Sequence, residues 1–479
     1  MLYLAANPLF MSRFMLLLWA SFIGCCHSVA QGLCSDSFNL VKTSEKSYPF
    51  PQQSMTSIHD ANDRDFVYVA SMEKGLVVLD ISTPSQWDIV AEMELSDTKD
   101  ADAMSLTQSG NFLYLALGNS FTDKQAPGLA IVDITDPNTP IVRDVWQFEK
   151  STSGGGIVKV QGDYAYLGAM GHGLIVLDIS NKDRIEFVSQ LVPSIKYPNA
   201  SNPDPLKYNA RGMDVHGDLV YLCYDAGGLR IINVKDKKNP RQTGRYSLPA
   251  LDKLPRAYNN VIYREGLVYV AIDYCGLEVL DVSDTASIEQ VYWLNPWDCT
   301  HSPLAWFSSK GHTNEMALIE ECQALGISTG KSEMILVDIS DPMEPVLCDS
   351  FGSILSKEGT WGISAYEQTF YLSYIHVPLG VPFKSNWAGI RAVELEGNCK
   401  DLSTPLISRK LRINTYVQHG QLQVEVSESG RTSRRMEVYG SDGKKWYKDS
   451  ISNSAVVPGL PSGIYLIRIE DTVVKVVLP

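Results

Sequence analysis

The chain has 479 residues, of which 41 are Lys or Arg and 55 are Asp or Glu, so its formal net charge is −14. Nucleic acids and anionic membranes bind basic protein surface, so this charge argues against both as partners. Hydrophobic residues make up 44% of the chain, which is enough apolar material for a large core.

An apolar run near the N-terminus predicts export. FMLLLWASFIG (14–24) follows Arg13 and leads to a small-residue pattern at Ser28-Val29-Ala30. This run is too short to span a bilayer, so residues 1–30 are predicted to be a secretory signal peptide. A lipoprotein acylated at Cys25 is the alternative. No other segment is long and apolar enough for a transmembrane span, and we expect a monomer at the cell surface or secreted, delivered via the periplasm.

One phrase recurs seven times along the chain. It reads GLVVLDIS (75–82), GLAIVDIT (128–135), GLIVLDIS (173–180), GLRIINVK (228–235), GLEVLDVS (276–283), EMILVDIS (333–340) and GIRAVELE (389–396). Around the third copy, alternating residues and Gly or Asp turns predict four short strands, over 156–161, 164–170, 174–180 and 185–191. Repeats of four antiparallel strands predict an all-β fold, a seven-bladed β-propeller over residues 34–405. A β-solenoid is the alternative, but its rungs are usually parallel and shorter.

The Asp, Asn or Glu residue in each phrase has two interpretations. These side chains, six carboxylates and the amide of Asn233, could serve as metal ligands. However, in DITDPNTP (133–140) and DISDPMEP (338–345) the Asp is followed by Ser or Thr and then Pro. Short polar side chains in this setting accept backbone N–H bonds and close turns, so we expect a structural role.

The versions LVVLD, LAIVD and LIVLD resemble the third-strand phrase of the LVIVD-repeat family of propellers. The resemblance covers residues from about 38 to 405. It implies a propeller and says little about function, because members of this family are mostly uncharacterised surface or secreted proteins.

Two segments are candidates for the fourth strand of the last repeat, SRKLRI (408–413) and FNLVKTS (38–44). We favour the N-terminal segment, because it has the shape of an outer strand that leads through a loop into an inner strand. A blade completed by both chain ends also protects the edges that an open ring would expose.

The region from residue 409 to 479 loses the repeat pattern. Its short alternating strands and Gly turns predict a small C-terminal β-sandwich. MEVYGSDGKKW (436–446), GLPSGIYLIRIE (459–470) and TVVKVV (472–477) make it similar to the C-terminal sorting domain of the type IX secretion system of Bacteroidetes. The resemblance implies a partner in that secretion machinery and passage across the outer membrane. An ordinary accessory sandwich is the alternative.

The cysteines predict disulfides and no metal. No CxxC or Cys/His spacing typical of zinc is present, and no cofactor motif is found, so we expect neither metal nor cofactor. In a four-stranded blade, Cys275 and Cys299 lie on connections at one end, and so do Cys34 and Cys399. We therefore predict the disulfides Cys275–Cys299 and Cys34–Cys399.

Propellers carry function on the loops of one face and around the central channel. Alignment of the repeats puts Asp102, Arg211, Asn259 and Glu315 near the starts of the innermost strands, and the loop 295–315 is the most unusual insertion. The ligand-binding candidates at these two places are Asp214, Asn260, Trp297, Asp298, His301, Trp306, His312, Asn314 and Trp361. Aromatic rings beside Asp, His and Asn suit carbohydrate or peptide ligands. The alternative is that these side chains fill the channel or cover blade edges.

The sequence contains no nucleophile elbow, metalloprotease helix or phosphate loop. It therefore favours a non-catalytic binding or scaffold module for a glycan or protein ligand on the loop face. The alternative is an exported hydrolase or lyase with a His/Asp site at the channel mouth, formed by His312 and Asp214.

Overall fold

The computed structural model describes residues 38–48, 53–119, 125–199, 201–301, 309–377 and 383–397, and six C-terminal segments, 412–418, 421–427, 434–440, 444–451, 454–469 and 472–478. The chain divides into two compact units, with the division after residue 398. None of the helices in these segments has the length and hydropathy needed to cross a membrane.

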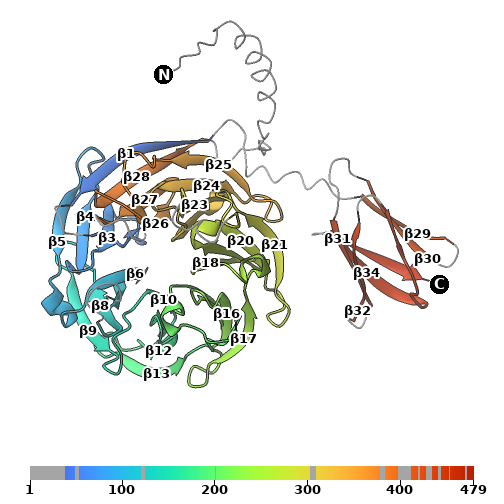
Figure 1. Ribbon diagram of the computed structural model, residues 1–479, viewed down its shortest axis with the longest axis horizontal. Coiled ribbons are helices and arrows are strands. Elements are labelled where there is room, and N and C mark those ends of the chain that lie inside the picture. The colour runs from blue at the N-terminus through green and yellow to red at the C-terminus, as the bar shows by residue number, and fades with distance from the viewer. Residues whose placement is uncertain are drawn as a thin grey trace, which may run out of the picture. The chain divides into compact units, whose positions relative to one another are not determined.

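The first unit consists of four-stranded antiparallel sheets arranged around a central axis (Figure 1). Six of the described sheets each use four consecutive strands. Their strands are β2 (Thr56–His59), β3 (Phe66–Ala70), β4 (Leu76–Asp80) and β5 (Asp88–Glu92); β6 (Ala103–Ser109), β7 (Phe112–Leu117), β8 (Gly128–Asp133) and β9 (Ile141–Gln147); β10 (Ile157–Gln161), β11 (Tyr164–Gly168), β12 (Leu174–Asp178) and β13 (Glu186–Leu191); β14 (Gly212–His216), β15 (Leu219–Cys223), β16 (Leu229–Asn233) and β17 (Arg241–Tyr246); β18 (Tyr258–Arg264), β19 (Leu267–Ile272), β20 (Leu277–Asp281) and β21 (Glu289–Leu294); and β22 (Met316–Ile319), β23 (Ala324–Ser328), β24 (Met334–Asp338) and β25 (Val346–Phe351).

A further sheet joins the two ends of the unit, in the order β1 (Asn39–Ser47), β28 (Gly389–Glu396), β27 (Thr369–Tyr374) and β26 (Thr360–Tyr366). Short 3₁₀ turns occur at η1 (Leu95–Thr98), η2 (Pro205–Lys207), η3 (Pro249–Leu251), η4 (Asp273–Cys275) and η5 (Glu320–Cys322). The architecture is an all-β propeller with almost no helix.

The repeated phrase forms the third strand of each sheet, and it is buried on both faces. In β4, Val78 packs between its own sheet and that of β6–β9, whereas Val77 and Leu79 pack against the sheet of β26–β28. A strand covered on both sides reads as a continuous apolar run, which explains LVVLD and its relatives. The core of this unit therefore lies between the sheets.

The Asp and Asn residues that end these strands close turns. Asp80, Asp133, Asp178, Asn233, Asp281 and Asp338 each accept a hydrogen bond from the backbone N–H two residues later, at 2.8 to 3.0 Å. The structural interpretation of these residues is confirmed.

The N-terminal strand closes the ring, as predicted. β1 pairs antiparallel with β28, from Asn39 opposite Glu396 to Ser47 opposite Gly389. Arg391 of β28 fixes the junction, because its Nε lies 2.9 Å from Glu45 of β1. The same guanidinium lies 2.7 Å from Glu358 and 3.1 Å from Glu333. The competing segment instead enters the second unit, where β29 (Arg412–Gln418) pairs with β30 (Gln421–Ser427).

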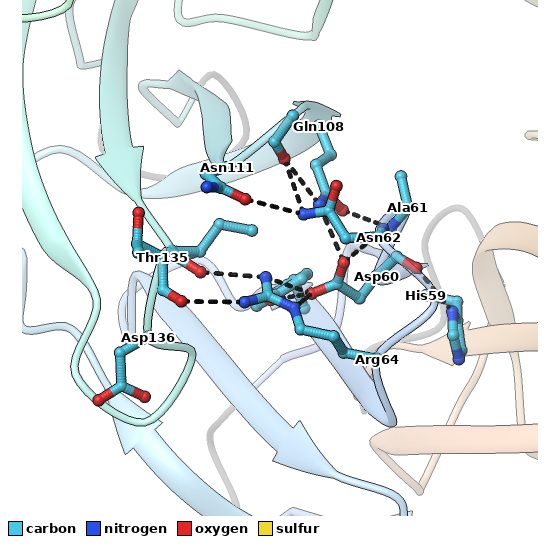
Figure 2. Close-up of polar contacts among 12 residues, drawn as sticks. His59, Asp60, Ala61, Asn62, Arg64, Gln108, Asn111, Thr135 and Asp136 are labelled. Atoms are coloured by element: carbon cyan, nitrogen blue, oxygen red, sulfur yellow. Dashed lines mark hydrogen bonds and ion pairs between the residues drawn. The ribbon is translucent and has the colours of Figure 1, made fainter.

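A polar cluster links the first two sheets on the face where the third strands end (Figure 2). Arg64 donates from Nε to the buried Asp60 carboxylate at 2.8 Å, and its Nη atoms donate to the carbonyls of Ile134 and Thr135 in the next sheet at 3.0 and 3.1 Å. Burial raises the pKa of Asp60, but hydrogen bonds from Tyr68, Asn62, Gln108 and Arg64 outweigh it, and the net shift is downward. Arg64 therefore joins two sheets, because it binds the ionised carboxylate of Asp60 in one sheet and two backbone carbonyls in the next.

The second unit contains two sheets with one shared core. One has the order β29, β30 and β33 (Ser454–Val457); the other has the order β32 (Lys445–Ile451), β31 (Arg434–Gly440), β34 (Gly463–Ile469) and β35 (Thr472–Leu478). Leu422 and Val424 of the first sheet cluster with Val438, Ile467 and other buried residues of the second. This unit buries its own apolar surface.

Candidate functional site

The innermost strands surround one small central cavity. Each sheet of the first unit contributes a lining residue from the equivalent position of its innermost strand. This residue directly precedes the one that pairs with the end of the second strand. These residues are Met55, Met104, Gly156, Arg211, Asn259, Asn314 and Trp361. Gly155, Met170 and Glu315 complete the lining, and the cavity volume is about 40 Å³.

Three of these positions are irregularities of the β-ladder. Register shifts fall between Ala103 and Ser105, between Tyr258 and Asn260, and between Thr360 and Gly362. The extra residues are Met104, Asn259 and Trp361. A bulge re-aims a side chain relative to the regular strand, so it explains how these three come to line the cavity.

The lining has a polar arc and an apolar arc. Arg211, Asn259, Asn314 and Glu315 form the polar arc, on consecutive sheets that begin with β14, β18 and β22. Trp361, Met55, Met104 and Met170 form the apolar arc from the remaining sheets. The guanidinium of Arg211 reaches the Trp361 ring, 5.6 Å from its centroid, so the two arcs meet across the cavity.

The two amides of the polar arc are held by the neighbouring sheet. Asn259 Nδ2 donates to the carbonyl of Thr313 at 2.7 Å, and Asn314 Nδ2 donates to that of Thr360 at 3.3 Å. The buried Asn259 Oδ1 accepts no hydrogen bond from any residue that the structure describes. These contacts fix the orientation of both amides before any ligand arrives.

Glu315, the acidic residue of the lining, has a strongly shifted pKa. Burial raises the pKa of its carboxyl to about 8, although the backbone N–H of Ile363 and the charge of Lys159 favour the ionised form. The side chain is therefore mostly protonated at neutral pH. A perturbed acid in a central cavity is typical of functional sites.

A second acidic group lies next to Arg211. Burial raises the pKa of Asp225 to about 6, and Asp273 adds to this rise, whereas Arg211 and a hydrogen bond from Asn209 oppose it. Asp273 itself contacts Nδ1 of His312. Both His312 and Asp273 are buried, and the His312 ring packs against Phe383 and Tyr274.

The predicted candidates are distributed over several places. Asn314 and Trp361 line the cavity. Asn260 does not line it, but the preceding residue, Asn259, does. Asp214 accepts hydrogen bonds from the backbone N–H groups of Val215 and Tyr263, at 2.9 and 2.8 Å. His312 contacts Asp273 rather than Asp214, so the predicted His312 and Asp214 pair is wrong.

The described first part of the loop that follows β21 does not line the cavity, whereas Asn314 and Glu315 at the end of the same loop do. Trp297 is half-buried and packs against Gly311 and the apolar cluster between the sheets of β18 and β22. Asp298 and His301 are exposed, and the Asp298 side chain accepts from Thr300. Trp306 lies outside the described residues.

The disulfide Cys275–Cys299 is confirmed, with a Cα–Cα distance of 5.2 Å. It ties the start of this loop to the turn between β19 and β20. Cys322 and Cys348 are also disulfide-bonded. Cys34 and Cys399 lie outside the described residues, so their bond stays a prediction.

No group of three or more His, Cys, Asp or Glu side chains is placed to hold a metal ion among the described residues. Asp102, a candidate from the sequence, accepts hydrogen bonds from Asn119 Nδ2 at 2.8 Å and Gln125 Nε2 at 3.1 Å.

Five stretches of the chain match the model of the LVIVD repeat, at residues 64–93, 100–144, 156–190, 256–291 and 327–352. The chain contains LVIVD repeats. No curated protein matches the chain. Each matched stretch contains one copy of the phrase that recurs in the sequence.

Solved structures with a similar fold include the WD40 repeats of RRP9, at 8% identity and a TM-score of 0.53 over 75% of this chain and 100% of that one. U3-55K matches at 7% identity and a TM-score of 0.51, over 75% of this chain and 99% of that one. The β-propeller domain of Cps50 (Swd1) from Myceliophteria thermophila matches at 12% identity and a TM-score of 0.51, over 74% and 99%. At these identities the likeness shows that the LVIVD repeats build a propeller, and nothing about function.

Proposed function

We propose that this protein is an exported, non-catalytic binding or scaffold module that presents the face around its central cavity to a glycan or protein ligand. Its first unit is a seven-bladed β-propeller, and its second unit is a β-sandwich that delivers the chain to the cell surface. The protein acts as a monomer and uses no cofactor.

The observation that carries the proposal is the variety of residues at one repeated register. The third strands of the repeats are nearly alike because they share the same two-sided burial. At the cavity register, however, the same repeats carry Met, Gly, Arg, Asn and Trp. A position that only closed the channel would be satisfied by apolar side chains throughout. The combination of apolar surface with a few fixed polar groups is typical of ligand sites.

The two ends of the chain support delivery to the surface. Residues 1–30 have the pattern of a secretory signal peptide, and residues 409–479 resemble the type IX sorting domain. The negative net charge is consistent with a ligand other than nucleic acid.

The enzyme alternative draws less support. His312 and Asp273 are both buried and contact each other. Their surroundings of Phe383 and Tyr274 favour a role in packing.

Screening the full chain against glycan and peptide libraries tests the proposal. We expect a ligand whose binding is weakened by Trp361→Ala, at the cavity, and unchanged by Trp446→Ala, which replaces an exposed Trp of the second unit. A ligand bound equally by both variants, or one converted into product, would contradict the proposal.

A further inference from the structure

The charge of the chain is divided unevenly between its two units. Residues 399–479, the second unit, contain 12 Lys or Arg and 8 Asp or Glu, whereas residues 1–398 contain 29 and 47. The negative net charge that argues against anionic partners therefore belongs to the first unit, and the second unit is basic. A surface of the second unit can bind an anionic partner that the net charge of the whole chain would repel.

One face of the larger sheet of the second unit is exposed and basic. Tyr465 and Ile467 of β34 are buried in the core between the two sheets of this unit. Side chains alternate between the two faces of a strand, so Ile464, Leu466 and Arg468 of β34 lie on the opposite face. We call this opposite face the outer face. It is formed by Ile464, Leu466 and Arg468 together with Arg435 of β31 and Lys445 and Lys448 of β32.

Glu437 of β31 lies among the basic side chains of the outer face. In the ladder it is opposite Lys448 on β32 and Arg468 on β34. Its carboxylate accepts hydrogen bonds from Lys445 Nζ at 2.6 Å and from Arg435 Nη2 at 3.0 Å. Burial raises the pKa of Glu437, but hydrogen bonds from its neighbours, Lys445 first, outweigh burial and lower the pKa to about 2. One carboxylate thus faces four basic side chains, and the outer face keeps a positive charge.

The outer face also exposes apolar side chains. Ile464 and Leu466 are 42% and 40% exposed, and they alternate with buried residues along β34. Trp446 of the edge strand β32 follows Lys445 and is 41% exposed, and the ammonium of Lys444 lies 4.9 Å from the centroid of its ring. Aliphatic, indole and basic side chains together are typical of protein surfaces that lie at a membrane interface.

An anionic lipid surface complements the outer face better than an acidic peptide does. Lipid phosphates bind basic side chains, and the boundary between headgroups and acyl chains accepts exposed apolar groups. An acidic peptide would neutralise the basic side chains but would leave Ile464 and Leu466 in water. The sheet is also four strands wide, which suits an extended surface rather than a narrow ligand.

We propose that the outer face of the second unit docks on a membrane surface that contains anionic lipids, with the basic side chains at the phosphate headgroups and Ile464 and Leu466 at the start of the acyl chains. This inference goes beyond the proposed function, because the partner is a lipid surface and the cavity face of the first unit takes no part. The attraction between the basic side chains and the headgroups is electrostatic, so salt weakens it.

Co-sedimentation with lipid vesicles tests the proposal. The chain from residue 31 onward is used, because the apolar run 14–24 would itself insert into vesicles. We expect binding to vesicles of phosphatidylcholine mixed with phosphatidylglycerol, at least roughly tenfold weaker binding to phosphatidylcholine alone, and loss of binding at high salt. Because the chain as a whole is acidic, binding to anionic vesicles has to come from a basic part of it.

Two double variants of the outer face separate its charged and apolar contacts. Lys448→Gln combined with Arg468→Gln removes two exposed charges, and we expect it to weaken vesicle binding roughly tenfold or more. Ile464→Ser combined with Leu466→Ser should weaken binding while leaving its salt dependence unchanged.

Lys235→Gln combined with Lys238→Gln, at exposed positions of the first unit, is the matched control. We expect this variant to bind vesicles as the unchanged chain does, because its two lysines lie outside the outer face. Melting temperatures of all variants check that the two units remain folded.

Absence of binding to anionic vesicles, equal binding to phosphatidylcholine alone, or full binding by both outer-face variants would overturn this proposal. Binding of polyglutamate without binding of vesicles would also overturn it, and would assign the outer face to an acidic protein. A chain that binds vesicles but no member of the glycan and peptide libraries would instead overturn the proposed function alone.

Discussion

Arg64 shows how a single side chain holds two sheets together. We expect Arg64→Ala to lower the free energy of unfolding by about 3 kcal/mol, because the buried Asp60 carboxylate loses its cation and the carbonyls of Ile134 and Thr135 lose a donor. Chemical denaturation of the full chain measures the change.

Arg143→Ala is the matched control. Arg143 forms an ion pair with Asp183 at 2.6 Å, but both side chains are exposed, at 35% and 60%. Solvent screens such a pair, so we expect a loss below about 1 kcal/mol. Equal losses in the two variants would show that Arg64 does not link the sheets.

Glu278 on β20 predicts a pH dependence of stability. Burial raises its pKa to about 7, although hydrogen bonds from Tyr246, Gln290 and Tyr258 favour ionisation. The unfolded carboxyl ionises near its usual value of 4.5. The folded state therefore binds the extra proton between these values, and stability falls as the pH rises from about 4.5 to 7, by on the order of 3 kcal/mol.

Thermal unfolding at pH 5 and pH 8 tests this prediction. The melting temperature of the wild type should be lower at pH 8 than at pH 5, and Glu278→Gln should make this difference smaller. Glu344→Gln, at an exposed position, should leave the fall unchanged. An identical fall in all three proteins would mean that Glu278 ionises normally in the folded state.

The strand β1 closes the ring of sheets by pairing with β28. A chain that lacks residues 38–47 leaves the edge of β28 without its partner, and exposed edges pair with other chains. We expect a lower melting temperature and association of this variant in light scattering. A chain that begins at residue 38 retains β1 and is the control. Unchanged melting and a monomeric deletion variant would show that the closure is dispensable.

The elements of the propeller could be predicted because burial on both faces makes the third strands continuous apolar runs. The closure by FNLVKTS (38–44) could also be predicted, since an outer strand and its loop precede each inner strand. The cavity was predicted only in part. The sequence analysis named five of the lining residues, Arg211, Asn259, Asn314, Glu315 and Trp361, but it did not name Met55, Met104 or Met170. Bulges such as that at Met104 change which residue faces the axis, and a regular alternation pattern cannot register them. Alignment of the repeats by strand register would have found Met55 and Met104.

The whole molecule divides into units with separate cores. Deleting residues 409–479 should therefore leave the melting transition of the propeller unchanged, since the cluster around Val438 and Ile467 lies within the second unit. If the second unit is a sorting domain, the truncated chain should remain in the periplasm. Thermal melts and cell fractionation measure the two outcomes. Normal surface display would contradict the sorting assignment, and an unfolded product would contradict the boundary.

The pairing of β1 with β28 also sets the order in which the chain can fold. The strand β1 is synthesised first but cannot pair until β28 has been made, because Asn39 lies opposite Glu396. The intermediate sheets can form from neighbouring residues, but the final seam requires contact across nearly the whole unit. Contacts of such long sequence separation form slowly. The ring therefore stays open until synthesis has passed residue 396, and the pairing of β1 with β28 forms only afterwards.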